Sequence, residues 1–265
     1  MATPLLAIHL HSFPPMDALL TSAASGMKAR MESLEMLANN LANQGSPGYK
    51  SDREFYSLYI APEALDGTGA DVIPLPPAVP LVERHWTDFS QGSLEETGNP
   101  LQAALTGRGF FTVQGPSGPL YTRNGSFRTS PDGGLETQDG YPVLDDQNKP
   151  VRIDPSLPVT LTSAGDIRQS GRRIGRLGLV DFAQPEGLAK RSGTYFQWNG
   201  PAGAVSAPPA ATQLHQGRLE RSNQPAAEGA IRLITLMRQF EMLQRAIQVG
   251  SEMNRRADEV ARPGQ

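Results

Sequence analysis

Apolar residues recur in the N-terminal part of the chain at alternating intervals of four and three residues. The positions are Leu20, Ala24, Met27, Met31, Leu34, Ala38 and Leu41. This heptad rhythm predicts a helix over residues 16–43 that packs along its length against another helix. The run from Asn43 to Gly48 ends the pattern, with Gly45 suited to a left-handed position after the helix. Because Gly26 costs roughly 1 kcal/mol relative to alanine inside a helix, we expect packing to hold this segment.

A second amphipathic pattern occupies residues 226–262. Its stripe consists of Leu233, Leu236, Phe240, Leu243 and Ile247, with Ile234 and Met237 widening it. Charged and amide side chains fill the remaining surface. The spacing alone leaves two arrangements open: a helical hairpin folded onto a β domain, or coiled-coil packing between molecules.

The segment between these helices has short strand patterns separated by turn residues. Residues 110–114 and 120–123 flank a Gly-Pro-Ser-Gly-Pro turn and predict a hairpin. The dipeptides Asn124-Gly125, Asp132-Gly133 and Asp139-Gly140 are typical of tight turns with positive φ. Further strands are predicted at 177–182 and 194–198. Five prolines between 60 and 82 indicate an extended linker.

These patterns predict an α+β fold with a mainly β middle and long helices at both ends. The expected divisions are a doubtful extension or tail at 1–15, an N-terminal helix and signature at 16–50, a proline-rich linker at 51–82, a β-rich domain at 83–215 and a C-terminal signature and helix at 216–265.

Composition narrows the class of protein. Of the 265 residues, 38% are hydrophobic, the formal net charge is −3, and there is no cysteine. The charge offers no case for nucleic-acid binding, and no apolar run is long enough for a membrane span. The absence of cysteine excludes disulfides and thiolate metal sites. Residues 1–15 fail as a secretory signal, so we expect Met16 to be the functional start.

Candidate chemistry is weak. Asp132, Asp139, Asp145 and Asp146 could hold calcium or act as a carboxylate pair, but turn formation explains them better. The histidines have no metal-binding spacing, and Gly107-Arg108-Gly109 runs into a strand instead of a helix. We therefore expect no metal, no cofactor and no enzymatic activity. One polar cluster, Asn39, Asn40 and Asn43, could bond carbonyls of a neighbouring chain or of its own helix end.

Three segments together resemble one family. Residues 37–50, LANNLANQGSPGYK, are similar to the N-terminal signature of bacterial flagellar rod and hook proteins. Residues 99–101, 107–111 and 121–127 resemble the central-domain pattern of that family. Residues 216–223, QGRLERSN, with the later stretch 238–241, resemble its C-terminal signature. The three motifs occur in order and cover nearly everything from residue 16 to 253. Gln224-Pro225 departs from the usual Val-Asn and puts subunit contacts there in doubt.

The resemblance implies a structural subunit of the flagellar basal-body rod, exported without a cleaved signal peptide and located in the periplasm. Its terminal helices would pair as a coiled-coil-like inner layer. Through them it would assemble into the shaft that transmits torque and encloses the export channel. Its expected partners are other copies of itself, neighbouring rod proteins and the flagellar type III export apparatus. Overall length and the stretch Arg238 to Met242 favour the proximal over the distal rod.

The residues expected at the assembly interface are the two heptad stripes and the amide cluster. They are Leu20, Ala24, Met27, Met31, Leu34, Ala38, Asn39, Asn40, Leu41, Asn43, Leu233, Leu236, Phe240, Leu243 and Ile247. Deleting residues 16–50 is expected to leave a soluble β domain that cannot assemble. Two other classes stay open: a secreted β-rich binding module with helical docking arms, and a hydrolase that uses the aspartates.

Overall fold

A computed structural model describes residues 15–59, 79–201, 205–206, 208 and 211–261. The chain divides into two compact units. The first comprises 1–36, 54–85 and 231–265, and the second comprises 37–53 and 86–230. The chain therefore passes between the units four times, within both long helices and within two strands. Long helices at the ends and strands in the middle confirm the predicted α+β class.

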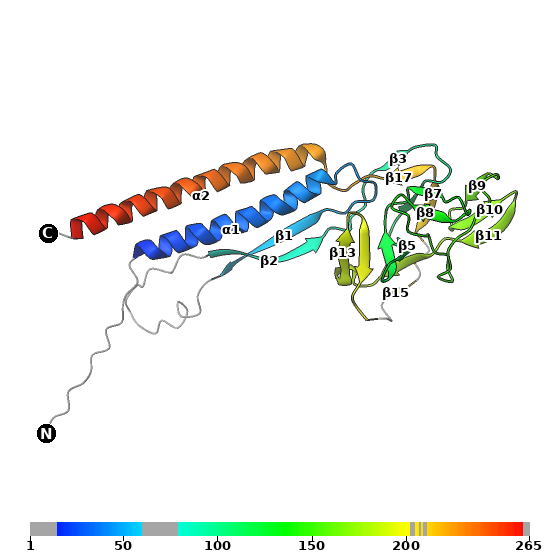
Figure 1. Ribbon diagram of the computed structural model, residues 1–265, viewed down its shortest axis with the longest axis horizontal. Coiled ribbons are helices and arrows are strands. Elements are labelled where there is room, and N and C mark those ends of the chain that lie inside the picture. The colour runs from blue at the N-terminus through cyan, green and yellow to red at the C-terminus, as the bar shows by residue number, and fades with distance from the viewer. Residues whose placement is uncertain (1–14, 60–78, 202–204, 207, 209–210, 262–265) are drawn as a thin grey trace, which may run out of the picture. The chain divides into compact units, whose positions relative to one another are not determined.

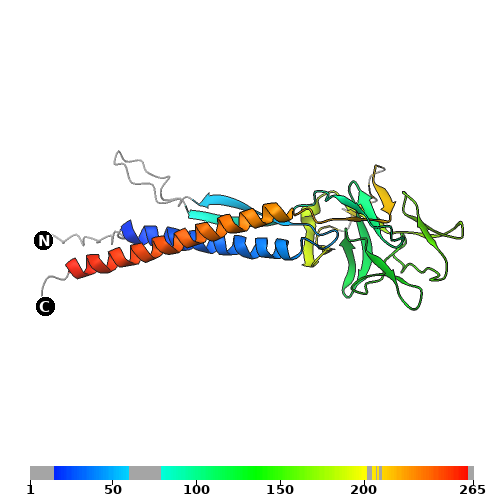
Figure 2. The ribbon, with the colours of Figure 1, turned by 90° about the horizontal axis from the view of Figure 1, so that it is seen from above.

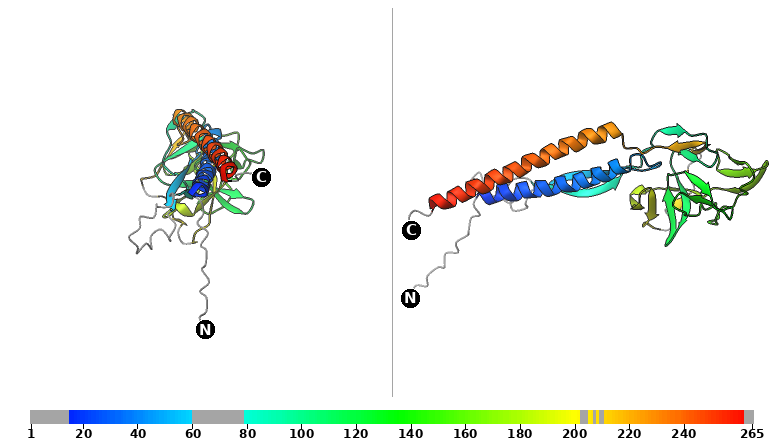
Figure 3. Two further views of the ribbon diagram at one scale, coloured as in Figure 1. Left: turned by 90° about the vertical axis from the view of Figure 1, so that its left-hand side faces the viewer. Right: turned by 45° about the horizontal axis from the view of Figure 1, so that its top comes forward.

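The first unit contains most of both long helices. Helix α1 spans Pro15–Ala42 and α2 spans Ala226–Ala261. Within the unit they run antiparallel and side by side, as Figures 1, 2 and 3 show from different directions. Proline at the first position of α1 fits the fixed φ and absent N–H that a helix start tolerates. Coiled-coil packing along their length stays a prediction.

Two strands accompany the helices. Strand β1, Asp52–Tyr59, and strand β2, Val79–Thr87, form a two-stranded sheet. The predicted linker 51–82 is therefore wrong at both ends, while residues 60–78 lie outside the described residues. The segment 52–59 contains Phe55, Tyr56 and Tyr59, and aromatic residues favour strands. The prolines that follow it led us to predict a linker instead. Arg232 of α2 lies 2.6 Å from Oε1 of Glu54 on β1 and ties this sheet to the helix.

The second unit is built around a six-stranded antiparallel sheet in the order β13-β14-β6-β5-β12-β15. Its strands are β5 Phe110–Gly115, β6 Gly118–Thr122, β12 Leu179–Phe182, β13 Leu188–Ser192, β14 Tyr195–Trp198 and β15 Val205–Ser206. Strands β5 and β6 confirm the predicted hairpin, and β12 and β14 fall inside the two further segments predicted as strands.

Smaller sheets complete the unit. Strands β9 Val159–Leu161, β10 Asp166–Gln169 and β11 Arg172–Arg176 form a three-stranded sheet with β10 in the centre. The two-stranded pairs are β3 Leu94–Glu96 with β17 Arg218–Glu220, β4 Ala103–Thr106 with β16 Gln213–Gln216, and β7 Phe127–Thr129 with β8 Leu135–Thr137. A short 3-10 turn, η2 Pro185–Gly187, precedes β13. Figure 1 shows β3 beside β17, so the C-terminal signature returns to the β unit before α2 begins.

The large sheet is buried on both faces. Phe111 belongs to a core of aliphatic and aromatic side chains that includes Ile167 and Leu214. Its neighbour Phe110 belongs to a second core with Phe182 and Phe196, where the rings meet edge to face. Successive residues of a strand point to opposite faces. Both neighbours are therefore apolar because each faces a different core.

The predicted turns are partly confirmed. Gly133 and Gly140 have φ of 77° and 86°, as expected for Asp-Gly turns. Gly125 does not have positive φ. A Cβ there would lie 1.7 Å from the carbonyl oxygen of Ala103, so close backbone approach is its physical reason. Gly45 is not left-handed either; Gly48 is, with φ 69°.

Candidate functional site

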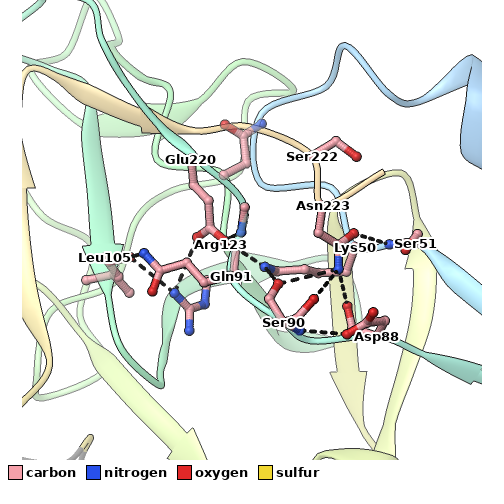
Figure 4. A network of polar contacts seen from close by, with 12 residues as sticks. Lys50, Ser51, Asp88, Ser90, Gln91, Leu105, Arg123, Glu220, Ser222 and Asn223 are labelled. Carbon is pink, nitrogen blue, oxygen red and sulfur yellow. Dashed lines mark hydrogen bonds and ion pairs between the residues drawn. The ribbon is translucent and has the colours of Figure 1, made fainter. Parts of the chain in front are cut away.

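A buried carboxylate holds two cations from distant parts of the second unit. Glu220 of β17 accepts from Lys50 Nζ at 2.6 Å and from Arg123 Nη1 at 3.3 Å. The side chains of Lys50 and Glu220 are both 0% exposed. Lys50 Nζ also donates to the carbonyl oxygen of Ser90 at 2.6 Å, and the N–H of Gly92 donates to Glu220 at 3.0 Å. Figure 4 shows these groups converging from four segments.

Burial works against both cations. It lowers the pKa of the Lys50 ammonium, and Glu220 opposes that shift. Burial likewise lowers the pKa of the Arg123 guanidinium, again against the attraction of Glu220. Arg123 gains further support from the carbonyl oxygen of Gly107 and from the ring of Phe110, whose centroid lies 5.4 Å away. Removing the carboxylate would leave two buried charges without a counter-ion, which is strongly destabilising.

Both the oxygen and the nitrogen of the Asn223 side-chain amide are hydrogen-bonded. Its Oδ1 accepts from the backbone N–H of Ser51 at 2.8 Å, and its Nδ2 donates to the carbonyl oxygen of Asp88 at 2.7 Å (Figure 4). Asp88 accepts from the N–H of Ser90 and pairs with Arg53. Partial burial opposes the charged form of Asp88, but these contacts outweigh it and hold its pKa below 3.8.

The end of α1 is fixed by a second group of contacts. Asn40 donates to the carbonyl oxygen of Asp52 at 2.8 Å and accepts from the N–H of Asp52 at 2.9 Å. The hydroxyl of Tyr49 donates toward the side-chain oxygens of Asn39 and Asn40, 2.9 and 3.0 Å away. Lys190 lies over the Tyr49 ring, 4.4 Å from its centroid, and Nζ is 2.7 Å from Asp52 Oδ2.

We call these residues the polar joint. It consists of Asn39, Asn40, Tyr49, Lys50, Ser51, Asp52, Asp88, Ser90, Arg123, Lys190, Glu220 and Asn223. All of them lie in the second unit. The joint binds the segment after α1 and the segment before α2 to the β strands. Most of its buried polar groups find partners within one chain; Nε of Arg123 is buried without a hydrogen-bond partner among the described residues.

The amide cluster predicted at the assembly interface is thus used partly for hydrogen bonds within the chain. Asn40 is buried and its amide is used within the chain. Asn43 donates to the carbonyl oxygen of Asn39, which is the bond to its own helix that the sequence left open. Lys50, Arg123 and Glu220 received no role from the sequence. The available signal was their position inside the three family motifs.

The chain buries a different face of α1 from the predicted stripe. Gly26, Ala29, Ser33, Leu37 and Asn40 are buried, on the opposite side from the exposed Ala24, Met31 and Ala38. Met27, Leu34 and Leu41 are half-buried between these faces. The side chain of Leu20 lies outside the described residues.

Helix α2 has two apolar faces. The predicted stripe turns inward: Leu236 is buried, and Leu233, Phe240, Leu243 and Ile247 are half-buried. Ile231, Met242, Val249 and Met253 lie on the opposite side, with Ile234 and Met237 flanking them. Ile231, Met242 and Val249 are 68%, 62% and 60% exposed. We call these six residues the outer face of α2.

Two of the aspartates considered for chemistry have structural partners, and Asp145 serves a turn. Oδ1 of Asp145 accepts from the N–H groups of Gln147 and Lys149, and Asp139 accepts from the hydroxyl of Tyr195. In the described part of the chain, no group of three or more histidines and acidic residues could hold a metal ion. No helix that the structure describes is long and apolar enough to span a membrane.

Comparisons with known proteins agree with this arrangement. Residues 20–50 match the family described as flagella basal body rod protein. Residues 104–171 match the flagellar hook protein FlgE/F/G D1 domain, and residues 215–260 match the C-terminal part of the flagellar basal body rod FlgEFG protein.

Relatives match over almost the whole chain. A flagellar basal-body rod protein FlgF from Caulobacter vibrioides is 35% identical over 247 residues, which covers 92% of this chain and 97% of the relative. A flagellar basal-body rod protein FlgG from Agrobacterium fabrum is 32% identical over 253 residues, covering 88% and 95%. A FlgG from Borreliella burgdorferi is 30% identical, with the same coverage.

These matches define the class as structural proteins shared by the flagellar hook and rod. Within that class, the chain belongs to the flagellar basal-body rod protein family. It is a structural subunit of the basal-body rod, and this family is not enzymatic. FlgF and FlgG relatives both match, so the comparisons do not choose a position within the rod.

Proposed function

We propose that the chain assembles with copies of itself and with neighbouring rod proteins through its terminal helices. The observation that carries the proposal is the outer face of α2, a row of large apolar side chains that are at least half exposed in the part of the chain that the structure describes. Exposed apolar patches of this kind mark interaction sites. The exposed Met31 on α1 adds a similar surface to the other helix.

The interface differs in part from the residues expected from sequence. We keep the stripe of α1 and add the outer face of α2. We assign Asn40 and Leu236 to the packing within the subunit, because both are buried in the single chain. The inward stripe of α2 holds its helix in place while the outer face meets a neighbour.

We further propose that the assembled helices form a tube that transmits torque and encloses the export channel. The polar joint supports this proposal because a shaft that carries torque needs subunits whose β units resist deformation. A buried polar network in which most groups are hydrogen-bonded rigidifies the segments that it connects. The subunit would reach the periplasm through the flagellar type III export apparatus without a cleaved signal peptide.

Position in the rod is proposed from the sequence alone, with the proximal rod favoured over the distal rod. The test is quantitative mass spectrometry of purified hook–basal bodies against the other axial proteins. A handful of copies supports the proximal rod, and several-fold more supports the distal rod. Absence from the basal bodies of a flagellated cell contradicts the assembly role itself.

The interface needs a separate test. Deletion of residues 16–50 is a poor choice because it removes Tyr49 and Lys50 from the polar joint. Deletion of residues 16–36 keeps every residue of the joint. We expect the shorter deletion to leave a folded β unit, seen by circular dichroism, that does not enter basal bodies. Incorporation at the normal level would contradict the proposal.

A further inference from the structure

The solvent face of the three-stranded sheet is strongly basic. Residues 166–176 contain four arginines and one aspartate in a chain of net negative charge. Asp166 Oδ1 is 3.2 Å from Nε of Arg173 and 2.9 Å from Nε of Arg176. Arg168 lies directly opposite Arg173 in the β10–β11 register. Among the described residues Arg168 has no carboxylate within ion-pair distance. We call Arg168, Arg173, Arg176 and the intervening Ile174 the arginine face.

Folding alone does not explain this arrangement. Like charges directly opposite each other on a sheet are destabilising. Charges and bulges protect edge strands from unwanted pairing, which accounts for charge on β11. Strand β10 is the central strand, however, so edge protection gives no reason for Arg168.

The bulge adds an apolar contact to the charges. Ile167 pairs with Gly175 and Arg168 with Arg173, so Ile174 has no partner and is 45% exposed. A bulge re-aims a side chain. Arginine beside an exposed apolar side chain is a composition enriched at protein interfaces.

The same unit carries a segment of opposite charge. Residues 132–146 contain five carboxylates and neither lysine nor arginine. Asp132 and Asp146 are exposed, and neither makes an ion pair in the part of the chain that is described. We call residues 132–146 the acidic meander. Glu136 of this segment is already paired with Arg128 at 2.9 Å. Asp146 donates its backbone N–H to the carbonyl oxygen of Arg176, but in the described part of the chain no carboxylate of the meander pairs with Arg168, Arg173 or Arg176.

We propose that the arginine face of one subunit docks on the acidic meander of a second copy in the assembled rod. The inference rests on the proposed self-assembly and names a second contact, outside the helices. Complementary charge fixes register and suppresses wrong partners more than it adds raw affinity. The helices would drive association. This contact would set the register in which the β units of neighbouring subunits meet.

The absence of cysteine from the chain allows a direct test. Two full-length copies with different tags are expressed together, one with Arg168→Cys and the other with Asp132→Cys or Asp146→Cys. Basal bodies are purified and treated with a short bismaleimide. The matched control replaces Arg168→Cys by Arg191→Cys, an exposed arginine on β13. We expect a product carrying both tags with Arg168→Cys, at several times the control yield.

The outcomes separate this inference from the proposed function. Yields equal to the control, or a product linked to a different protein, overturn the docking contact while assembly stands. Absence of the untouched chain from basal bodies overturns both. Charge reversal gives an independent readout: Arg168→Glu with Arg173→Glu should lower incorporation roughly tenfold. Adding Asp132→Arg and Asp146→Arg in the same chain should restore it, and failure of restoration in a folded variant contradicts the contact.

Discussion

The polar joint and the outer face of α2 are opposite solutions to the placement of polar and apolar groups. The joint buries charges that water would stabilise, and it matches nearly every one with a partner in the same chain. The outer face exposes side chains that water disfavours, and the described residues leave them uncovered. The family motifs concentrate in the joint, whereas the surface proposed to meet other subunits lies outside the quoted motif residues. On this proposal, motif residues hold the subunit together and exposed apolar residues of the helices join it to its neighbours.

The largest loss of stability should follow from removing the shared carboxylate. Glu220→Ala leaves Lys50 and Arg123 buried without a counter-ion, so we expect a loss of about 3–5 kcal/mol in the free energy of unfolding. Urea denaturation of the full chain measures it. Glu95→Ala is the control, because Glu95 pairs with Arg221 where both are more than half exposed. That control should cost less than about 1 kcal/mol. Equal midpoints for the two variants would refute the importance of the joint.

A smaller loss should follow from Tyr49→Phe. The variant keeps the ring under Lys190 but removes the hydroxyl shared by Asn39 and Asn40, which should cost about 1–2 kcal/mol. Tyr141→Phe is matched in chemistry, since the Tyr141 hydroxyl makes no hydrogen bond among the described residues. Its effect should stay within about 0.5 kcal/mol. A Tyr49→Phe midpoint identical to that of Tyr141→Phe would contradict the prediction.

Acid should weaken the joint through Asp88. Its folded pKa lies below the ordinary 3.8, so its contribution is present above 3.8 and is lost as pH falls through the folded pKa. The contribution is at most about 1 kcal/mol because Arg53 is half exposed. In Asp88→Asn the free energy of unfolding should fall less steeply below pH 3.8 than in the original chain. Parallel curves in that range would show that another carboxyl is responsible.

The smallest effect on stability should come with the largest effect on assembly. Met242→Glu changes an exposed residue of α2, so the free energy of unfolding should move by less than about 0.5 kcal/mol. Burying the new charge against a neighbour is costly, and incorporation into basal bodies should be lost. Met242→Leu keeps an apolar side chain of similar size at the same position and should assemble. Normal incorporation of Met242→Glu would exclude the outer face from the interface.

The sequence predicted features whose partners are close along the chain. The N-terminal helix, the hairpin at 110–122 and the turns at Gly133 and Gly140 each depend on local periodicity or local φ preference. It missed strands β1 and β2 because prolines between them suggested a linker. It also missed the polar joint, since Lys50 and Glu220 are 170 residues apart and no local rule connects them. The face of α1 that is buried was misjudged because its small residues, Gly26, Ala29 and Ser33, carry little hydrophobic signal.

The thioethers on the exposed helix faces have a chemical consequence. Met31, Met237, Met242 and Met253 are all at least half exposed, and oxidants convert such side chains to polar sulfoxides. A subunit oxidised before incorporation would carry polar groups where a neighbour requires apolar ones, whereas a subunit already covered would be protected. Under the proposed assembly, the oxidation state of these four residues therefore records whether a given molecule met peroxide before or after it was incorporated.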